Sequence, residues 1–456
     1  MRRLYKLFAM RIFTVLFISF TACSFFACES PRQATSQKGP EPAGWYAGDM
    51  HVHRNCGTDS VVDVQQLAKM MEVNDLDVIS VLADMGNGEV LYSKKDLSKV
   101  NGQPAPESVN GRLVNWDVEW HWDATYSQFE KQALGGHLVL LGLQNAQQIW
   151  EESPYKVLDW GKKQGAVSGF AHMEYLNDSI QNKLNCCIPV DYPVEAAMET
   201  IDFVSEDVFG AGSPNGGNYF ADGAINAYYK LLNCGFRISL VAGTDYPCNN
   251  YEPLGTVLTY VQVPGNEELT YSKWLEGIAK GRTVVSRNAH NEFLDLKVNG
   301  TEGPGAEINI AKGEELTISV NWSANQNLSG PLEIVSNGKV IATQEATADK
   351  GNSAGITHKQ VFNESGWICA RRMGNGGHMV HTSPVYVTID HQPVRASAAD
   401  ADFFIRWIDN ILHNIQPGGE WNRFFPNDYE SVSDRYNRAK QIYQQIKKEA
   451  SSKSSS

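Results

Sequence analysis

The sequence lacks the basic surface that polyanion-binding proteins use. Its 456 residues contain 39 lysines and arginines against 52 aspartates and glutamates, for a formal net charge of −13. No basic run follows the first eleven positions. Because nucleic acids and anionic membranes attract proteins through basic patches, this composition argues against binding of either kind through charge. We expect a small-molecule substrate and no nucleic-acid partner.

The hydrophobic run near the start of the chain, residues 12–20, is too short to span a bilayer as a helix of the mature protein. Basic residues precede it, and small residues and cysteine follow it, as in a secretory signal. We expect the signal peptide at residues 1–22. Thr21-Ala22-Cys23 resembles a bacterial lipobox, so Cys23 is the expected lipidation site. Cys28, or ordinary cleavage without a lipid, is the alternative.

These features predict an exported protein, in the periplasm or at the cell surface, whose membrane association is through a lipid anchor only. Residues 23–43 are expected to form a flexible tether, since Pro, Gln, Ser, Thr and Gly predominate from residue 29 on. Export also allows disulfides. No cysteine spacing matches a zinc motif such as paired CxxC. We expect buried thiols with one or two disulfides, rather than catalysis, from Cys56, Cys186, Cys187, Cys234, Cys248 and Cys369.

The part after the tether is too long for one ordinary core, so at least two domains are expected. Residues 44–290 alternate apolar runs with helical patterns, which predicts a parallel α/β sheet or barrel. Helices are predicted at 61–72 and 154–164. Strands are predicted at 76–81, 137–142, 166–171, 201–204 and 238–242.

The pattern changes after residue 290. Residues 291–392 show period-two alternation with Asn-Gly turns, which indicates a β-sandwich. Its predicted strands lie at 294–298, 316–320, 332–335 and 385–389. Residues 393–456 read as two helices, broken near 417–419, with a frayed tail from Lys447.

Two histidines open the predicted sheet domain, in Gly48-Asp49-Met50-His51-Val52-His53. On a strand His51 and His53 leave the same face, while Val52 points to the other. Two adjacent imidazoles suit a divalent transition metal. The pair alone is weak evidence, because surface or core histidines are more common than ligands.

Further polar residues stand at strand ends in the same predicted domain, where α/β barrels place their chemistry. Glu119 lies in Asn115–Trp120, and His137 opens the predicted strand 137–142. His172 and Asp245 each follow a buried strand. Each could be a structural residue when taken singly. Together with His51 and His53 they predict a ligand set.

The motifs GDMHVH, GHLVLLGL, FAH and AGTD, in that order, resemble the PHP (polymerase and histidinol phosphatase) family. Residues 365–371 and 381–386 extend the similarity to the CehA/McbA-type branch, named for carbamate-hydrolysing enzymes. The resemblance covers nearly everything from Trp45 onward. It implies a distorted (β/α)7-type barrel followed by a small β-sandwich and a C-terminal helical segment.

The resemblance also implies how the ligands divide between two metals. His51, His53 and Asp245 would hold one metal, and His137 and His172 a second. Glu119 would bridge the two. Glu130 is an alternative for the bridging position, because the gap before the GH motif varies between relatives.

The chain departs from the family pattern at two positions. It has Ala83-Asp84-Met85 where many members carry an aspartate-histidine pair, and Asp245-Tyr246-Pro247 where they carry aspartate-x-histidine. Methionine and proline are not ligands for hard metals. We therefore expect one or two divalent ions, Zn, Mn or Fe, and no third. Asp59 and Asp84 could orient neighbouring groups or serve a plain surface or capping role.

These observations predict a metal-dependent hydrolase that uses a metal-activated water on a phosphoester, ester or carbamate bond. Asp245 would accept the proton, and Glu119 would be the second catalytic residue. The alternative is a non-catalytic exported lipoprotein that binds a glycan or small molecule. The sequence leaves the oligomeric state open.

Substrate contacts are predicted in the Gly-rich stretch near residue 374. Arg371, Arg372 and His381, with His378 beside them, could offer cations to an anionic leaving group. A solvated hairpin is the alternative for this stretch. Trp116, Trp120 and Trp122 could stack on a substrate, although core packing is the more common role of tryptophan.

Overall fold

The computed structural model describes most of the chain from residue 39 onward, so the predicted signal peptide (1–22) and Cys23 lie outside the described residues. None of the helices in the described part combines the length and the apolar character that a bilayer crossing requires. The described ranges are 39–55, 61–85, 93–121, 136–147, 153–171, 191–206, 224–248, 253–265, 267–375, 377–419, 421–422 and 428–453.

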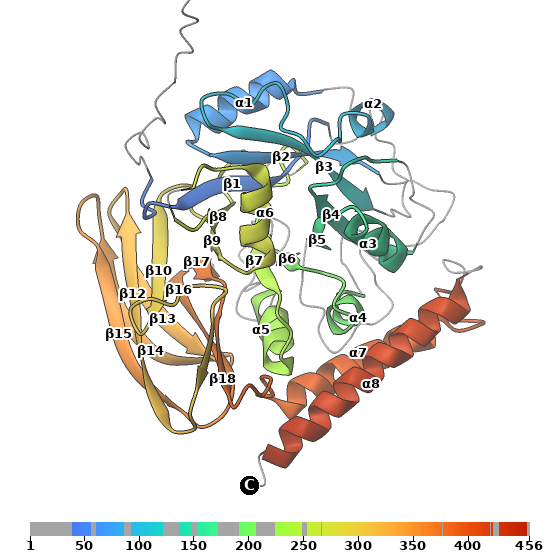
Figure 1. Ribbon diagram of the computed structural model, residues 1–456, viewed down its shortest axis with the longest axis vertical. Helices are drawn as coiled ribbons and strands as arrows, with labels where there is room; N and C mark the ends of the chain where they lie inside the picture. Colours follow the sequence, from blue (N-terminus) through green and yellow to red (C-terminus); the bar gives the residue numbers. More distant parts are fainter. Residues whose placement is uncertain are drawn as a thin grey trace, which may run out of the picture. The chain divides into compact units, whose positions relative to one another are not determined.

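Residues 37–456 have a mixed α/β fold built on one large sheet, drawn in Figure 1. The strands of its first half run in the order β9-β8-β1-β2-β3-β4-β5-β6-β7. Their bounds are β1 Trp45–Val52, β2 Val78–Asp84, β3 Leu113–His121, β4 His137–Leu141, β5 Val167–Phe170, β6 Phe203–Ser205, β7 Ser239–Val241, β8 Leu258–Gln262 and β9 Thr283–Ser286.

The sheet is mixed, which corrects the expectation of a parallel one. β1, β2 and β3 are parallel, and so are β5, β6 and β7, but β4 is antiparallel to both β3 and β5. β8 is antiparallel to β1 and β9. The error has a physical cause. A strand buried on both faces is apolar whichever way it runs, so its composition does not reveal its direction.

The strand order is an open path that ends at β7, and in the described residues no ladder joins β7 to β8 or β9. Side-chain hydroxyls connect these strands instead. Thr259 Oγ lies 2.8 Å from both N and O of Ala242. Thr283 donates to the carbonyl of Leu240 at 2.7 Å. The predicted (β/α)7-type barrel is therefore not confirmed: the strands form an open path, and β8 and β9 contact the β7 segment through side-chain hydrogen bonds.

Six helices lie between these strands in the described part of the chain. They are α1 Val64–Val73, α2 Ser93–Leu97, α3 Pro154–Lys162, α4 Tyr192–Ala197, α5 Ala224–Cys234 and α6 Tyr271–Ala279. Every residue of α4 is buried. The start of α1 is set by a capping box. The side chain of Asp63 accepts from the backbone N–H of Gln66, and the side chain of Gln66 accepts from the backbone N–H of Asp63. Leu67 and Met71, four positions apart, are buried on its inner face. The predicted helices 61–72 and 154–164 are confirmed to within a few residues.

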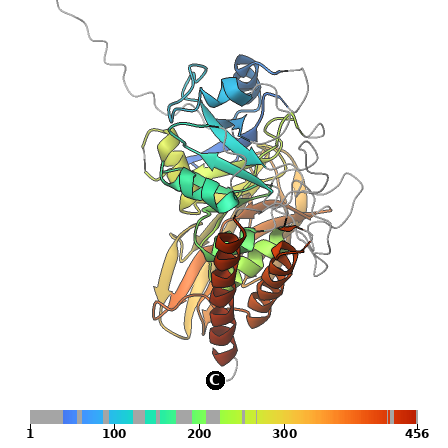
Figure 2. The ribbon, with the colours of Figure 1, turned by 90° about the vertical axis from the view of Figure 1, so that its right-hand side faces the viewer.

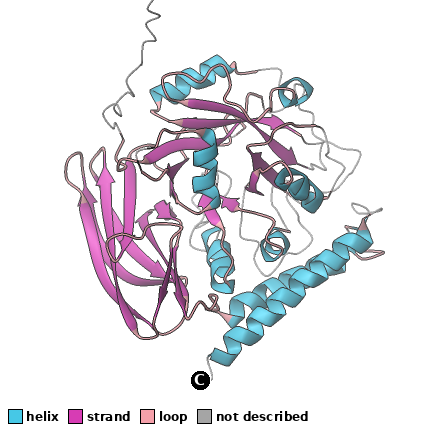
Figure 3. Cartoon of the chain, viewed as in Figure 1, coloured by secondary structure: helices cyan, strands magenta, loops and turns pink. Residues whose placement is uncertain are grey.

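The strands from residue 292 on, which Figure 3 draws as magenta arrows, divide between two sheets. β10, β12 and β15 form a separate three-stranded sheet, while the others extend the large sheet through pairing of β17 with β9. Strand bounds are β10 Glu292–Val298, β11 Glu307–Ile310, β12 Glu314–Ala324, β13 Leu328–Ser336, β14 Lys339–Ala348, β15 Ala354–Phe362, β16 Gly366–Gly374, β17 Gly377–Thr382 and β18 Val385–Ile389.

The predicted Asn-Gly turn between residues 336 and 339 is confirmed as the hairpin of β13 and β14. Asn337 and Gly338 both have positive φ, of 49° and 78°, as a two-residue hairpin turn requires. The predicted boundary at residue 290 falls between β9 and β10, yet hydrogen bonding continues across it through β17. The later strands other than β10, β12 and β15 are thus part of the same sheet that carries the predicted ligands.

Two helices complete the chain, α7 Ala398–Ile415 and α8 Tyr429–Lys453, and they run side by side in Figures 1 and 2. α8 is held to α4 by a buried ion pair between Arg435 and Glu195. The hydroxyl of Tyr443 donates to the carbonyl of Pro193 at 2.8 Å. The frayed tail expected from Lys447 is wrong, since α8 continues to Lys453.

Candidate metal centre

The ends of three strands and one loop bring the predicted ligands together. His51 lies in β1 and His53 directly follows that strand. Glu119 lies near the end of β3, and His137 is the first residue of β4. Asp245 follows β7, in a loop that bridges back to β1 through Val52 and Tyr246. Because β4 runs antiparallel to β3, its first residue lies at the edge where β3 ends.

An extra residue in β1 turns the two histidines toward Glu119. The pairing of β1 with β2 advances three residues along β1, from Asp49 to Val52, while β2 advances two. Since side chains alternate along a strand, this bulge reverses the face of every residue that follows it. His51 and His53 therefore point to the face opposite to the one that simple alternation from Asp49 would give.

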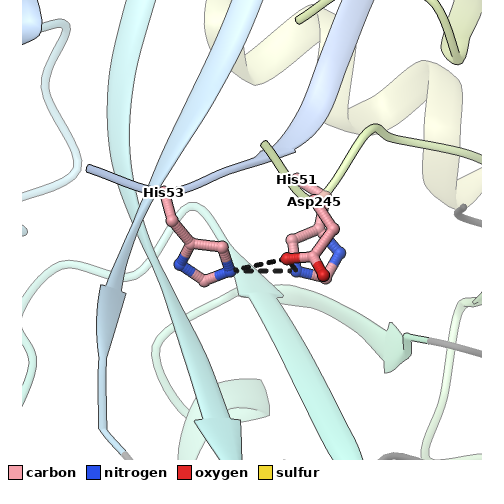
Figure 4. A group of neighbouring side chains, drawn as sticks. All are labelled: His51, His53 and Asp245. Atoms are coloured by element: carbon pink, nitrogen blue, oxygen red, sulfur yellow. Dashed lines mark hydrogen bonds and ion pairs between the residues drawn. The ribbon is translucent and has the colours of Figure 1, made fainter. Parts of the chain in front are cut away.

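His51, His53 and Asp245 lie close together, as Figure 4 shows. The two imidazole Nε2 atoms lie 3.2 Å apart. Oδ1 of Asp245 is 3.3 Å from Nε2 of His51 and 3.2 Å from that of His53. All three residues are buried, with exposed fractions of 0%, 6% and 3%. Two imidazoles and a carboxylate at these separations could hold one divalent transition-metal ion.

Glu119 lies between this group and His137. Its Oε2 is 3.0 Å from Nε2 of His53, and its Oε1 is 3.4 Å from Nε2 of His51. Oε1 is also 2.9 Å from Nδ1 of His137. One carboxylate thus contacts imidazoles from two different strands, β1 and β4. The bridging role that the sequence resemblance implies for Glu119 stays a prediction.

The charges in the group are strongly coupled. Burial would raise the pKa of Glu119, but the imidazoles of His137, His51 and His53 outweigh it and hold that pKa well below its ordinary value. Burial likewise would lower the pKa of His53, yet the carboxylates of Glu119 and Asp245 raise it to about 9. The buried imidazoles and carboxylates thus stabilise one another's charged forms.

Several predicted residues are outside the described part of the chain. They include His172, the second predicted ligand of the second metal, and Glu130, the alternative to Glu119. Asp59 is outside it as well. Asp84 is described and buried, and it pairs in register with Glu119 across β2 and β3. Met85 next to it is a fully buried core residue, as expected of a side chain that does not bind metal.

The predicted substrate cations are engaged inside the protein. Arg372 is 4% exposed and forms a bidentate ion pair with the buried Glu292. Nε of Arg371 donates to Oε2 of its cross-strand partner Glu333 at 2.7 Å. His381 is fully buried, with Nε2 2.7 Å from the hydroxyl of Tyr229. These contacts support structural roles for Arg371, Arg372 and His381. Their contact with a substrate stays a prediction.

The lowered pKa of His381 also supports a structural role for this residue. Burial, together with the neighbouring His378 and Arg371, holds the pKa of His381 well below its ordinary value. This shift disfavours the cationic form of the imidazole. Of the three predicted tryptophans, Trp116 and Trp120 are buried in the core, and Trp122 lies outside the described residues.

One polar pair was missed. Glu206 directly follows β6, at the same kind of position as the predicted ligands, and Nε2 of His378 lies 2.7 Å from its Oε2. Both residues are buried. The signal was present in the sequence, since Glu206 ends a buried apolar run as Asp245 does. The three cysteines in the described part follow the expectation: Cys234 and Cys369 are buried free thiols, and Cys248 is disulfide-bonded. Cys56, Cys186 and Cys187 lie outside the described residues.

Comparisons with known proteins add little to this geometry. No family model matches the chain, and no curated protein does. Among solved structures, an endonuclease Q in complex with a 27-mer DNA duplex is similar at 12% identity, a TM-score of 0.29, and coverage of 51% of this chain and 56% of that one. The lesion-specific endonuclease Q of Pyrococcus furiosus gives 13% identity, a TM-score of 0.28, and coverage of 52% and 56%. At these scores the similarity carries no argument about activity.

The expectation of no nucleic-acid partner is nevertheless withdrawn. It rested on net charge and on the lack of a basic run in the sequence, and one of the similar structures is a complex with a 27-mer duplex substrate. The net charge of a whole chain does not describe a local surface. The composition therefore does not exclude a nucleic acid.

Proposed function

We propose that the chain is a metal-dependent hydrolase of PHP type that cleaves a phosphoester, ester or carbamate bond. The observation that carries the proposal is the convergence of His51, His53, Asp245 and Glu119 in one buried group. The resemblance of the motifs to the PHP family and its CehA/McbA-type branch is consistent with it. Export and lipidation at Cys23 belong to the same proposal and rest on the sequence alone.

The donor set fits a divalent ion. Imidazole nitrogens and carboxylate oxygens bind Zn, Mn and Fe, and all donors in this group are buried within contact of one another. His51, His53 and Asp245 would hold one ion, and His137 lies across Glu119 on the side where a second would bind. Such ions lower the pKa of water and polarise the bond that is attacked.

The protein side chains then have separate tasks. Asp245 places one carboxylate oxygen within 3.3 Å of both imidazoles, so it is the natural acceptor for a proton released in the reaction. Glu119 keeps its negative charge, because the imidazoles hold its pKa well below the ordinary value. The burial of the whole group excludes bulk water and strengthens these interactions.

The test combines metal content with activity. The protein is purified without chelator, reconstituted with Zn, Mn or Fe, and analysed for bound metal. It is then assayed on chromogenic phosphomonoesters, phosphodiesters, carboxyl esters and carbamates. We expect at least one bound ion per chain and turnover of one ester class. His53→Ala should lose both, while His413→Ala, at an exposed position of α7, should keep both.

Two results would contradict the proposal. Absence of bound metal after reconstitution would favour the exported binding protein. Equal metal content and turnover in the wild type and His53→Ala would show that the histidine pair is not the site.

A further inference from the structure

The buried carboxylate of Asp49 contacts the backbone of the segments that carry the candidate ligands. Asp49 is in β1, two residues before His51, and none of its surface is exposed. Its Oδ1 accepts from the backbone N–H of Thr244 at 3.0 Å and of His51 at 3.3 Å. Its Oδ2 accepts from the hydroxyl of Thr244 at 2.5 Å and the backbone N–H of Gly255 at 3.1 Å. One side chain thus receives four hydrogen bonds from three segments.

Two of these three segments carry metal ligands. Thr244 immediately precedes Asp245, and it is held through both its backbone and its side chain. His51 is itself a ligand candidate, and its backbone N–H is the third donor. The carboxylate therefore joins the strand that supplies both histidines to the loop that supplies the aspartate.

The loop that carries Asp245 packs closely against β1. A Cβ added to Gly243 would lie 2.6 Å from Cβ of His51 and 3.0 Å from Oδ1 of Asp49, so a larger residue does not fit there. Asp245 has a positive φ of 54°, a conformation that aspartate tolerates but does not favour. An unfavourable backbone conformation persists when the surroundings hold it in place. The contacts of Asp49 with Thr244 do so.

We propose that Asp49 is a positioning residue for the metal centre, which sets the location of Asp245 relative to His51 through Thr244. The inference rests on the proposed function. Ligand atoms must be held within about 0.5 Å of their working positions for a site to bind well. Groups that orient ligands without touching the metal typically affect affinity about 10- to 100-fold. We expect an effect of that size here.

The test uses substitutions that alter the hydrogen bonds of Asp49 and spare the ligands. Thr244→Val removes the hydroxyl donor at nearly constant volume, and Asp49→Asn places an amide group where donors converge. Thr244→Ser restores the hydroxyl. Thr283→Val is the matched control, because Thr283 is also fully buried and its hydroxyl donates to the carbonyl of Leu240 at 2.7 Å. This control removes a similar bond that does not involve the ligands.

Three measurements separate positioning from general stability. Zn²⁺ affinity is measured by competition with a chromogenic chelator, coordination geometry by the visible spectrum of the Co²⁺ form, and stability by thermal unfolding of the metal-free protein. Thr244→Val and Asp49→Asn should lose about 10- to 100-fold in Zn²⁺ affinity and show a changed Co²⁺ spectrum. Thr244→Ser should resemble the wild type. Thr283→Val should lower the melting temperature and leave affinity and spectrum unchanged.

Wild-type affinity and spectrum in Thr244→Val would overturn the inference, even if Asp49→Asn fails to fold. An equal loss of affinity in Thr283→Val would overturn it as well, since the effect would then follow stability. Absence of metal binding by the wild type would overturn the proposed function itself, and the inference with it.

Discussion

Oε1 of Glu119 and Nδ1 of His137 lie 2.9 Å apart, although the two residues belong to antiparallel strands. The other oxygen of the same carboxylate faces His53 at 3.0 Å. Glu119 is 4% exposed, so both contacts are made away from bulk water. The carboxylate therefore connects the imidazoles of His51 and His53 to that of His137.

Glu119→Gln tests that charge at almost constant shape. We expect less bound metal per chain and a fall in kcat of about 100-fold or more, because a neutral amide neither bridges cations nor balances the imidazoles. Elemental analysis and steady-state kinetics measure the two effects. Glu364→Gln, at an exposed position, is the control and should behave as the wild type. Full metal content in Glu119→Gln would remove Glu119 from the ligand set.

Arg372→Met distinguishes a structural from a substrate-binding role. Removing the guanidinium leaves Glu292 charged and fully buried beside Trp322, so we expect a loss of about 3–5 kcal/mol in the free energy of unfolding. The KM for a turned-over ester should not change. Urea unfolding and steady-state kinetics supply the numbers. Unchanged stability with a KM raised tenfold would restore the role that the sequence first suggested.

Because the pKa of Asp77 is raised in the folded protein, we expect its contribution to stability to fall as pH rises. Burial is the main cause that raises its pKa from 3.8 to about 6, and the nearby Glu41 adds to it. Between these two pH values the folded state holds a proton that the unfolded state has lost, so stability decreases through this window and is lowest above it. Asp77→Asn removes the penalty and can still accept from the backbone N–H of Ala47.

The difference in unfolding free energy between Asp77→Asn and the wild type should therefore grow from pH 4 to pH 6 and level off above pH 7. Denaturant unfolding at each pH gives the curve. Asp390→Asn, at an exposed turn, should show no such trend. A pH-independent difference for Asp77→Asn would contradict the prediction.

The buried ion pair between Arg435 and Glu195 should contribute far more to the free energy of unfolding than the exposed pair that Lys440 of α8 forms. Both side chains are buried, at 8% and 0% exposure. Arg435→Met should cost about 3–5 kcal/mol, because Glu195 would remain charged in the interior, and adding Glu195→Met should recover most of that loss. The ion pair of Lys440 with Asp409 is much more exposed, so Lys440→Met should lower the free energy of unfolding by less than about 1 kcal/mol. Chemical unfolding of the four proteins decides between these magnitudes.

The sequence was informative where local pattern determines the outcome. Alternation placed His51 and His53 on one face, and the position of His137 at the start of a strand was correct. What depends on distant partners could not be predicted. The direction of β4 and the bulge in β1 follow from pairing with neighbouring strands. Arg372 looked like a free cation because Glu292, its partner, lies 80 positions away in the chain.

The pairing of β9 with β17 affects how the protein can be divided. β9 is bonded to β8 on one side and to β17 on the other. A fragment that ended at residue 290 would keep the candidate ligands His51, His53, Glu119, His137 and Asp245 but leave one edge of β9 with unpaired N–H and C=O groups. Such an edge is a template for pairing with another chain. The C-terminal strands therefore also protect the metal-binding part from self-association.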